Sequence, residues 1–345
     1  MISQAIKKLV AGEHLTENEA VNVMTEIMEG RASAAQIAAL LTALRLKGEH
    51  VDEITGFARV MRQKAVPVKS KHPLLVDTCG TGGDGARTFN ISTTAAFVLA
   101  GAGAKVAKHG NRSVSSCCGS ADLLEALGVR INLTAEQAGR CLDECGICFL
   151  FAPQLHRAMK HAAAPRKEIG IRTVFNILGP LTNPAGAQAQ VLGVYDAGLV
   201  DKLARVLARL GSKRVFVLHG AGGLDEVSLA GPTVVCAVWE GRITGYTINP
   251  TDYGFAPAPV EALAGGTAEE NAAITREILK GAGGPRRDAV VLNAALGLIC
   301  AGKAADIAAG IKLAQWSIDS GAAAAKLEEL VRFTAALPGR GVVSF

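Results

Sequence analysis

Apolar residues recur at helical spacing in the first part of the chain, and each set follows a polar helix-start signal. Thr16 with Glu19, and Ser33 with Gln36, have the spacing of a capping box, and an apolar stripe follows each pair. A further periodic segment comes next, before a proline and a polar stretch that is typical of a linker. We therefore predict a small all-helical domain over residues 1–70.

From Leu74 the pattern changes to short apolar runs that alternate with amphipathic segments. The expected strands cover 74–77, 105–107, 148–151, 190–194, 214–218, 234–238 and 243–248. The expected helices include 92–101, 121–127, 134–144, 199–210, 268–280 and 287–300. This alternation predicts an α/β domain over residues 71–345, in which helices cover both faces of one central sheet.

Composition and charge narrow the class of protein. Hydrophobic residues make up 49% of the chain and aromatic residues only 4%, so the core must be aliphatic. The net charge of +5 is spread out, without the basic stripe that nucleic-acid-binding proteins usually carry. No apolar run reaches the ~18 residues that span a bilayer, and no signal peptide is evident. We expect a cytoplasmic protein with a small-molecule substrate and neither a nucleic-acid nor a membrane partner.

Three cysteines, Cys141, Cys145 and Cys148, have a spacing that iron–sulfur proteins also use. The pattern over 134–144 predicts an amphipathic helix, which puts the first two thiols one turn apart on one face. The third begins an apolar strand. Small apolar residues on a buried face explain all three, and we favour this interpretation.

A glycine-rich segment, CGTGGDG at residues 79–85, follows the first expected strand. Glycines turn the chain tightly and present backbone N–H groups to an anion. Three of them also match the dinucleotide fingerprint G-x-G-x-x-G, but the next strand ends in Lys108 and His109 rather than in an acid for the ribose hydroxyls. The loop contains no lysine, which argues against an NTPase P-loop. A glycine-rich turn without a ligand is the remaining alternative.

Two further polar segments support an anion site. Asn90, Ser92 and Thr93 stand at the head of a helix, where they can act as N-caps or hold a phosphate. Residues 108–116, KHGNRSVSS, are rich in hydrogen-bond donors and follow the second strand. Ligands of open α/β sheets bind beyond the carboxyl ends of the strands. We predict that these loops bind a ligand with several phosphates, with a solvated loop as the alternative for 108–116.

Two adjacent acids, Asp225 and Glu226, follow the strand expected at 214–218. Carboxylates at such a position suit a hard cation that prefers oxygen ligands. A solvated turn is the alternative interpretation of this pair.

Several motifs, in order, resemble the anthranilate phosphoribosyltransferase family over essentially the whole chain. They are DTCGTGGD at 77–84, NIST at 90–93, KHGNR at 108–112, GSAD at 119–122, FLFAP at 149–153 and RKEIGIRTVFNILGPLTNP at 166–184.

The resemblance implies a nucleoside phosphorylase/phosphoribosyltransferase (class II-like) fold, in which a segment near 166–190 contributes to the helical domain. It also implies transfer of a phosphoribosyl group from phosphoribosyl diphosphate to anthranilate, in tryptophan biosynthesis. Magnesium, with two ions per subunit, and a homodimer are further expectations from the family.

The family's site residues carry over to matching positions of this chain. Those implied for phosphoribosyl diphosphate are Gly80, Gly83, Asp84, Thr88, Asn90, Ile91, Ser92, Thr93, Lys108, His109, Gly110, Asn111, Arg112, Ser113, Val114, Ser115, Ser116 and Ser120. Gly80, Asn111 and Arg166 are implied for anthranilate, since arginine binds a carboxylate well. Ser92, Asp225 and Glu226 are implied for the metal. His109 is a candidate proton acceptor, which we favour more as a scaffold residue; for Arg166, a surface salt bridge is the alternative.

The chain departs from the family pattern at Cys117 and Cys118, where a basic residue and a serine are common. The phosphate loop thereby loses a positive charge, which predicts weaker substrate binding. Two rivals remain: a pyrimidine nucleoside phosphorylase, which shares the fold, and a nucleic-acid-binding relative that has lost the chemistry. The retained acids and the glycine loop argue against both.

Overall fold

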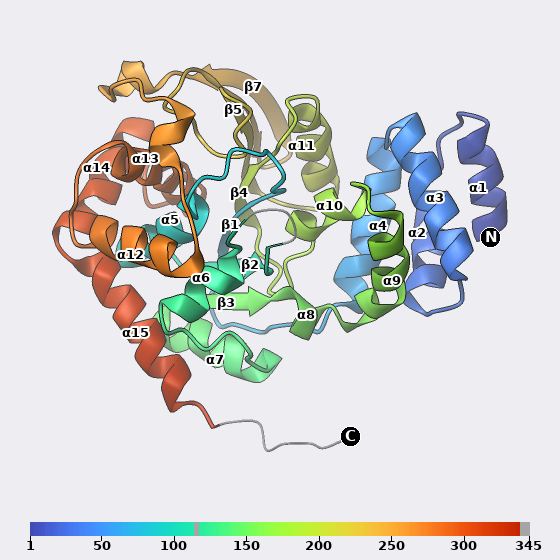
Figure 1. The fold of residues 1–345 in the computed structure, drawn as a ribbon, viewed down its shortest axis with the longest axis horizontal. Helices are drawn as coiled ribbons and strands as arrows, with labels where there is room; N and C mark the ends of the chain where they lie inside the picture. The colour runs from blue at the N-terminus through green and yellow to red at the C-terminus, as the bar shows by residue number, and fades with distance from the viewer. Residues whose placement is uncertain (114–116, 339–345) are drawn as a thin grey trace.

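The computed structural model describes residues 1–113 and 117–338, as a smaller helical part beside a larger α/β part (Figure 1). The N-terminal helices are α1 (Ile2–Val10), α2 (Glu17–Met28), α3 (Ala34–Lys47) and α4 (Val51–Lys64). Both predicted capping boxes are confirmed: Thr16 accepts a hydrogen bond from the Glu19 amide, and Ser33 accepts one from the Gln36 amide. Each box fixes where its helix begins.

A seven-stranded mixed sheet forms the centre of the larger part, in the order β3-β2-β1-β4-β5-β6-β7. Neighbours from β3 to β5 pair in parallel, whereas β6 and β7 are antiparallel. The bounds are β1 (Val76–Gly80), β2 (Val106–Gly110), β3 (Ile147–Phe151), β4 (Ala189–Gly193), β5 (Arg214–Gly220), β6 (Thr233–Trp239) and β7 (Arg242–Ile248). All seven expected strands are therefore present.

Two expected strand ends were wrong, and both lie at the site. β1 continues to Gly80, and β2 includes Lys108, His109 and Gly110, which the sequence had suggested for a loop. The reason is the backbone ladder: Gly80 pairs with Gly193, and residues 108–110 pair in register with β3. Backbone hydrogen bonds continue the strands although the side chains there are polar or absent.

Helices cover both faces of the sheet, as predicted. Val191 and Phe216 belong to the core shared with α5 (Ile91–Gly101) and α13 (Pro285–Cys300). Leu192 and Val217, which alternate with them, belong to a second core. The remaining helices are α6 (Ser120–Ala126), α7 (Ala135–Cys145), α8 (Ala152–Leu155), α9 (Lys160–Ile169), α10 (Phe175–Leu178), α11 (Leu199–Arg209), α12 (Ala268–Leu279), α14 (Ile307–Asp319) and α15 (Ala322–Ala336), with 3-10 turns at Arg157–Met159, Gly179–Leu181, Pro250–Tyr253 and Val260–Leu263.

The second core joins the two parts of the molecule. It combines the buried faces of α1 to α4 with those of α11, β4 and β5. Ala162, Phe175 and Leu178, from α9 and α10, belong to the same cluster. The chain thus returns to the helical part after β3, and Figure 1 shows α9 beside α2 and α3. The division of the chain at residue 70 stays a prediction.

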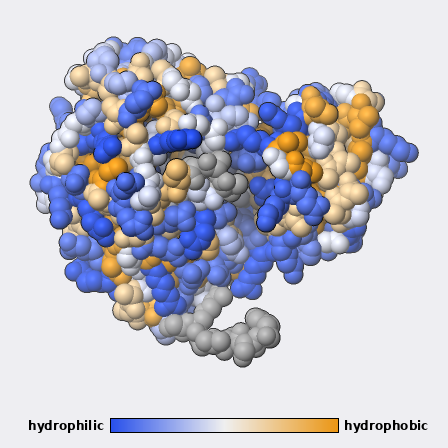
Figure 2. Space-filling view, in the orientation of Figure 1, coloured by the Kyte–Doolittle hydropathy of each residue, from blue (hydrophilic) through white to orange (hydrophobic). Residues whose placement is uncertain are grey.

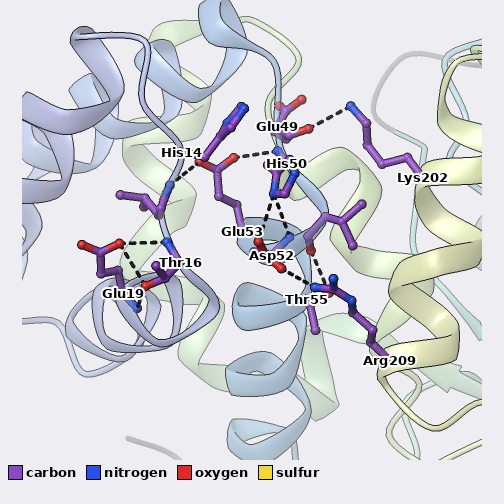
Figure 3. Close-up of polar contacts among 12 residues, drawn as sticks. His14, Thr16, Glu19, Glu49, His50, Asp52, Glu53, Thr55, Lys202 and Arg209 are labelled. Carbon is purple, nitrogen blue, oxygen red and sulfur yellow. Dashed lines mark hydrogen bonds and ion pairs between the residues drawn. The ribbon is translucent and has the colours of Figure 1, made fainter.

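Polar contacts around the start of α4 join the helical part to α11 through Arg209 and Lys202 (Figure 3). Glu53 has no exposed side-chain surface and pairs with Lys47, at 2.9 Å between Nζ and Oε1. Its carboxylate also accepts hydrogen bonds from the amides of Leu15 (2.9 Å) and His50 (2.7 Å). Next to it, Asp52 pairs with Arg209 of α11. The loop before α4 is therefore held to both parts of the molecule.

The three closely spaced cysteines are buried between α7 and β3. Cys141 donates to the Ile147 carbonyl at 3.2 Å, and the side chains of Cys145 and Cys148 lie in the same apolar core. These positions agree with their interpretation as small apolar residues. Across residues 1–113 and 117–338, every helix is too short or too polar to cross a lipid bilayer.

Candidate functional site

The acidic pair lies against the ends of β1 and β4, where glycine leaves the necessary space. A side-chain carbon on Gly80 would overlap the Asp225 carboxylate, and one on Gly193 would overlap the Asp225 backbone. Gly80 and Gly193 are partners in the parallel ladder. Because Gly80 and Gly193 have no side chains, the segment that carries Asp225 can pack against the carboxyl edge of the sheet.

The glycine loop is bonded to the same carboxylate. The Gly82 amide donates to Asp225 Oδ2 at 2.7 Å, and Gly82 and Gly83 have φ of +62° and +75°, which other residues rarely adopt. Asp84 accepts a hydrogen bond from the Ala86 amide at 3.2 Å, and its charge acts on Asp225. Thr88 forms an antiparallel bridge with Ala264. The loop thus carries Gly80, Gly83 and Asp84 close to the acidic pair.

The pKa values of the two half-buried acids are strongly raised. Burial, with the nearby charge of Asp84, raises the pKa of Asp225 to about 7. Burial and the charge of Asp225 raise the pKa of Glu226 to about 8. Glu226 Oε1 accepts a hydrogen bond from the Ser92 amide at 3.0 Å. The structure therefore brings together Ser92, Asp225 and Glu226, the three residues expected at the metal.

Lys108 is the buried cation beside the acids. Its ammonium donates to the Thr78 carbonyl and lies 3.4 Å from Ser92 Oγ. Burial lowers its pKa, and the charges of Asp77 and of the acidic pair oppose that shift. Desolvated charges interact strongly at such short range. A positive charge thus lies at the head of α5, where a diphosphate is expected.

A buried polar network under β2 was not expected from the sequence. Asp77 accepts hydrogen bonds from the His109 amide (3.1 Å) and from Asn183 Nδ2 (2.8 Å). Burial, and then the neighbouring His156, lower the pKa of His109 to about 3, so its imidazole is neutral near pH 7. Asp77 and Asn183 both lie in motifs that signalled the family, but their pairing joins positions 106 residues apart.

The head of α5 has no side-chain N-cap. The Asn90 side chain instead donates to the Cys118 carbonyl at 3.1 Å and accepts from Asn271 Nδ2 at 3.0 Å. Ile91 and Thr93 are buried in the helix, and Thr93 Oγ1 has no partner among the described residues. The capping interpretation of Asn90 was therefore wrong: its amide ties α5 to the segment before α6.

The second phosphate loop is only partly described, because Val114, Ser115 and Ser116 lie outside the described residues. Arg112 forms ion pairs with Asp122 (2.9 Å) and Glu125 (2.6 Å) of α6. The Asn111 side chain accepts a hydrogen bond from the Arg112 amide, and the Ser113 amide donates to Asp122.

Gly110 ends β2 against Ser120, the first residue of α6. The departing residue Cys117 is exposed, whereas Cys118 is buried. The loop is thus anchored to α6 on both sides of residues 114–116.

Arg166 lies in the last turn of α9. Its guanidinium stacks over Phe175, 4.9 Å from the ring centroid, and burial lowers its pKa. Among the described residues it has no carboxylate partner, so the surface salt-bridge interpretation was wrong. No contact joins it to Asn111 or Gly80 within the described part of the chain.

A cavity of about 230 Å³ lies between the N-terminal helices and the segments around α10 and α11. Its lining includes Arg45 and Glu49 from the N-terminal helical part, Arg172 from the segment before α10, and Tyr195 and Lys202 from the α/β part.

The donor set beside the glycine loop fits a divalent cation with oxygen ligands. Over residues 1–113 and 117–338, no three His, Cys, Asp or Glu side chains gather as a ready metal site. Asp225 and Glu226 supply two carboxylates, and Ser92 supplies a hydroxyl. A bound cation stabilises two partly buried acids that repel each other. Mg²⁺ commonly takes one or two protein carboxylates together with substrate phosphates. The chemistry of these residues therefore suits a magnesium–diphosphate complex.

Comparison with known proteins gives a consistent result. The glycosyl transferase family matches twice, as its helical bundle domain at residues 3–65 and its a/b domain at 72–324. An anthranilate phosphoribosyltransferase of Pelotomaculum thermopropionicum is 68% identical, over 97% of each chain. The crystal structure of that enzyme from Thermus thermophilus is 48% identical, with a TM-score of 0.91 over 96% of this chain and 99% of that one.

A more distant relative was solved with its ligands. The anthranilate phosphoribosyltransferase of Saccharomyces cerevisiae, in complex with PRPP and Mg, is 29% identical, with a TM-score of 0.89 over 97% of this chain and 98% of that one. The predicted fold class, a small all-α domain with an α/β domain, is confirmed.

Proposed function

The chain belongs to the anthranilate phosphoribosyltransferase family, and from this premise we propose how its residues carry out the reaction. The enzyme transfers the phosphoribosyl group of phosphoribosyl diphosphate to the amine of anthranilate. The products are N-(5-phosphoribosyl)anthranilate and diphosphate, in L-tryptophan biosynthesis. One observation supports these roles above all: the glycine loop, Ser92 and the acidic pair lie together at one edge of the sheet.

Asp225, Glu226 and Ser92 hold magnesium, as two ions per subunit. Support comes from the yeast relative, which was solved with PRPP and Mg, and from the partial burial of both acids next to each other. When bound, magnesium neutralises the charge that develops on the leaving diphosphate. The number of two ions rests on family resemblance.

The residues of the chain bind and orient the diphosphate sugar. Lys108, the backbone amides of the glycine loop and the head of α5 all present positive charge or N–H donors to an anion. The reaction is a direct displacement at the anomeric carbon with inversion. The amine of anthranilate already has a free lone pair at neutral pH, so positioning supplies most of the rate.

Arg166, Asn111 and Gly80 bind anthranilate. The Arg166 guanidinium is partly desolvated and has no acid partner among the described residues, which leaves it available to a carboxylate. His109 serves as a scaffold residue, because a pKa of about 3 makes its neutral imidazole a weak base. Closure of the two domains excludes water from the reactive sugar.

Removal of the acidic pair tests the metal assignment. The double variant Asp225→Ala, Glu226→Ala should lose turnover at all practical magnesium concentrations, because the diphosphate then leaves without its counter-charge. Steady-state rates over a magnesium titration measure this, with Glu144→Ala, an exposed acid on α7, as the matched control. Full activity in the double variant would remove the assignment.

The enzyme is a homodimer formed through its helical domain, residues 1–70, and is located in the cytoplasm. Val10 of α1 and Leu46 of α3 are 74% and 84% exposed, and Figure 2 shows hydrophobic residues on the surface of the helical part. Exposed apolar surface is often covered by a partner. Light scattering of the pure protein should give the mass of two chains, and Leu46→Glu should shift it towards one.

A further inference from the structure

Arg172 grips the glycine loop from a segment to which no role has been assigned. It lies between α9 and α10, and its Nη2 donates to the Gly82 carbonyl at 3.0 Å. The guanidinium stacks on the ring of Tyr195, 3.9 Å from the ring centroid. Arginine suits this double task because its planar group stacks and donates at once.

Both backbone polar groups of Gly82 form hydrogen bonds. The Gly82 amide donates to Asp225, and the Gly82 carbonyl accepts from Arg172. In a trans peptide the carbonyl oxygen and the next N–H point in opposite directions. Fixing the Gly82 carbonyl therefore fixes the Gly83 N–H, which then points away from the guanidinium. Among the described residues, that N–H has no acceptor.

Tyr195 and Gly83 complete the arrangement. The Tyr195 amide donates to Thr81 Oγ1 at 3.1 Å, so the residue that supports Arg172 is itself tied to the loop. A side-chain carbon on Gly83 would overlap the Arg172 guanidinium. Gly83 thus needs to be glycine for two reasons, its φ of +75° and this contact.

We propose that Arg172, supported by the Tyr195 ring, is a positioning residue that orients the Gly83 N–H towards the diphosphate of phosphoribosyl diphosphate. This inference rests on the proposed function of the same loop. Arg172 lies three residues after the end of α9, which carries Arg166 and packs on α3. The hydrogen bond from Arg172 therefore also ties the loop to the side of the molecule that is proposed to bind anthranilate.

The main test compares Arg172→Met with Arg214→Met, in which an arginine stacked on Trp239 away from the loop is removed. Arg172→Met should raise KM for phosphoribosyl diphosphate about tenfold, equal to ~1.4 kcal/mol, and leave KM for anthranilate unchanged. Arg214→Met should change neither. An unchanged KM for phosphoribosyl diphosphate, or equal rises in both KM values, would overturn the proposal.

The supporting ring gives a second, independent readout. Tyr195→Phe keeps the ring and should behave as wild type, whereas Tyr195→Leu should raise the same KM as Arg172→Met. Both effects should occur without a change in Tm, which separates positioning from folding. Equal effects of Phe and Leu would contradict the role of the ring.

Two glycine variants separate backbone strain from displacement of Arg172. Gly83→Ala and Gly85→Ala have nearly equal φ, +75° and +74°, but only the first would push the guanidinium away. Gly83→Ala should raise KM for phosphoribosyl diphosphate more than Gly85→Ala does. In the double variant with Arg172→Met, the increase should be smaller than the two single effects combined. Additive effects would show that Gly83 does not act through Arg172.

A binding measurement distinguishes this inference from the proposed function. Calorimetric titration of each variant with the magnesium complex of phosphoribosyl diphosphate needs no turnover. Weaker binding by Arg172→Met supports the inference even if anthranilate proves not to be the acceptor. Binding equal to wild type overturns it even if the enzyme is an active transferase.

Discussion

Replacing Asp225 by Asn should stabilise the metal-free protein at alkaline pH, although it removes a residue needed for activity. The variant keeps an oxygen that can accept the hydrogen bond from the Gly82 amide, but it carries no charge. Asp225 is half-buried next to Asp84 and Glu226, and its pKa rises from 3.8 to about 7. Ionisation of this carboxyl therefore opposes folding when no cation is bound.

The magnitude follows from the pKa shift. Between pH ~4 and ~7 the folded chain keeps a proton that the unfolded chain has lost, so stability falls as pH rises through this range. Between pH 5 and pH 7, the free energy of unfolding of the wild type should fall by about 3 kcal/mol through this carboxyl, and little more above pH 7. The advantage of Asp225→Asn over wild type should grow by this amount from about pH 5 to about pH 8.5.

Urea unfolding followed by circular dichroism, in chelator, measures the difference. Asp143→Asn is the matched control, because hydrogen bonds from Ser70 and Lys71 lower the pKa of Asp143. Its effect should be the same at pH 5 and pH 8.5, because a carboxyl with a folded pKa below 3.8 is ionised in both the folded and the unfolded chain throughout this range. Magnesium should stabilise wild type and not Asp225→Asn. An equal effect of Asp225→Asn at both pH values would refute the electrostatic account of this site.

Three further changes test other parts of the structure. Glu53→Ala leaves Lys47 buried without its partner and two amides without an acceptor, so urea unfolding should show a loss of about 3–5 kcal/mol, with no measurable loss for Glu144→Ala. Cys117→Lys restores a charge to the phosphate loop and should lower KM for phosphoribosyl diphosphate; an unchanged KM would sink that idea. Gly193→Ala would overlap the Asp225 backbone and should sharply reduce the yield of folded protein; normal expression and Tm would contradict the close approach seen there.

The sequence located the elements better than the contacts between them. Apolar runs marked the strands β3 and β4 because both are buried along their whole length, whereas β7 is exposed over most of its length. Helix starts such as Thr16 follow from local capping chemistry. The ends of β1 and β2 were missed, because backbone ladders extend the strands through Gly80 and Lys108 without an apolar signal.

The candidate site shows the same limit more clearly. Motifs identified Ser92, Asp225 and Glu226, but the bond from Gly82 to Asp225 spans 143 residues and cannot be inferred from periodicity. Arg112 was expected to bind phosphate, and the structure shows that its guanidinium forms ion pairs with Asp122 and Glu125. Arg172 lies within the motif at 166–184, but its contact with Gly82 depends on tertiary packing and gives no signal in the sequence.

The most direct test of the central claim is the fluorescence of anthranilate mixed with the pure protein and phosphoribosyl diphosphate. With magnesium present, the signal of free anthranilate should fall as the amine is consumed, and chelation of magnesium should stop the loss. The same loss in chelator would contradict the role given to Ser92, Asp225 and Glu226. No loss with magnesium, in protein that is folded, would contradict the assigned reaction itself.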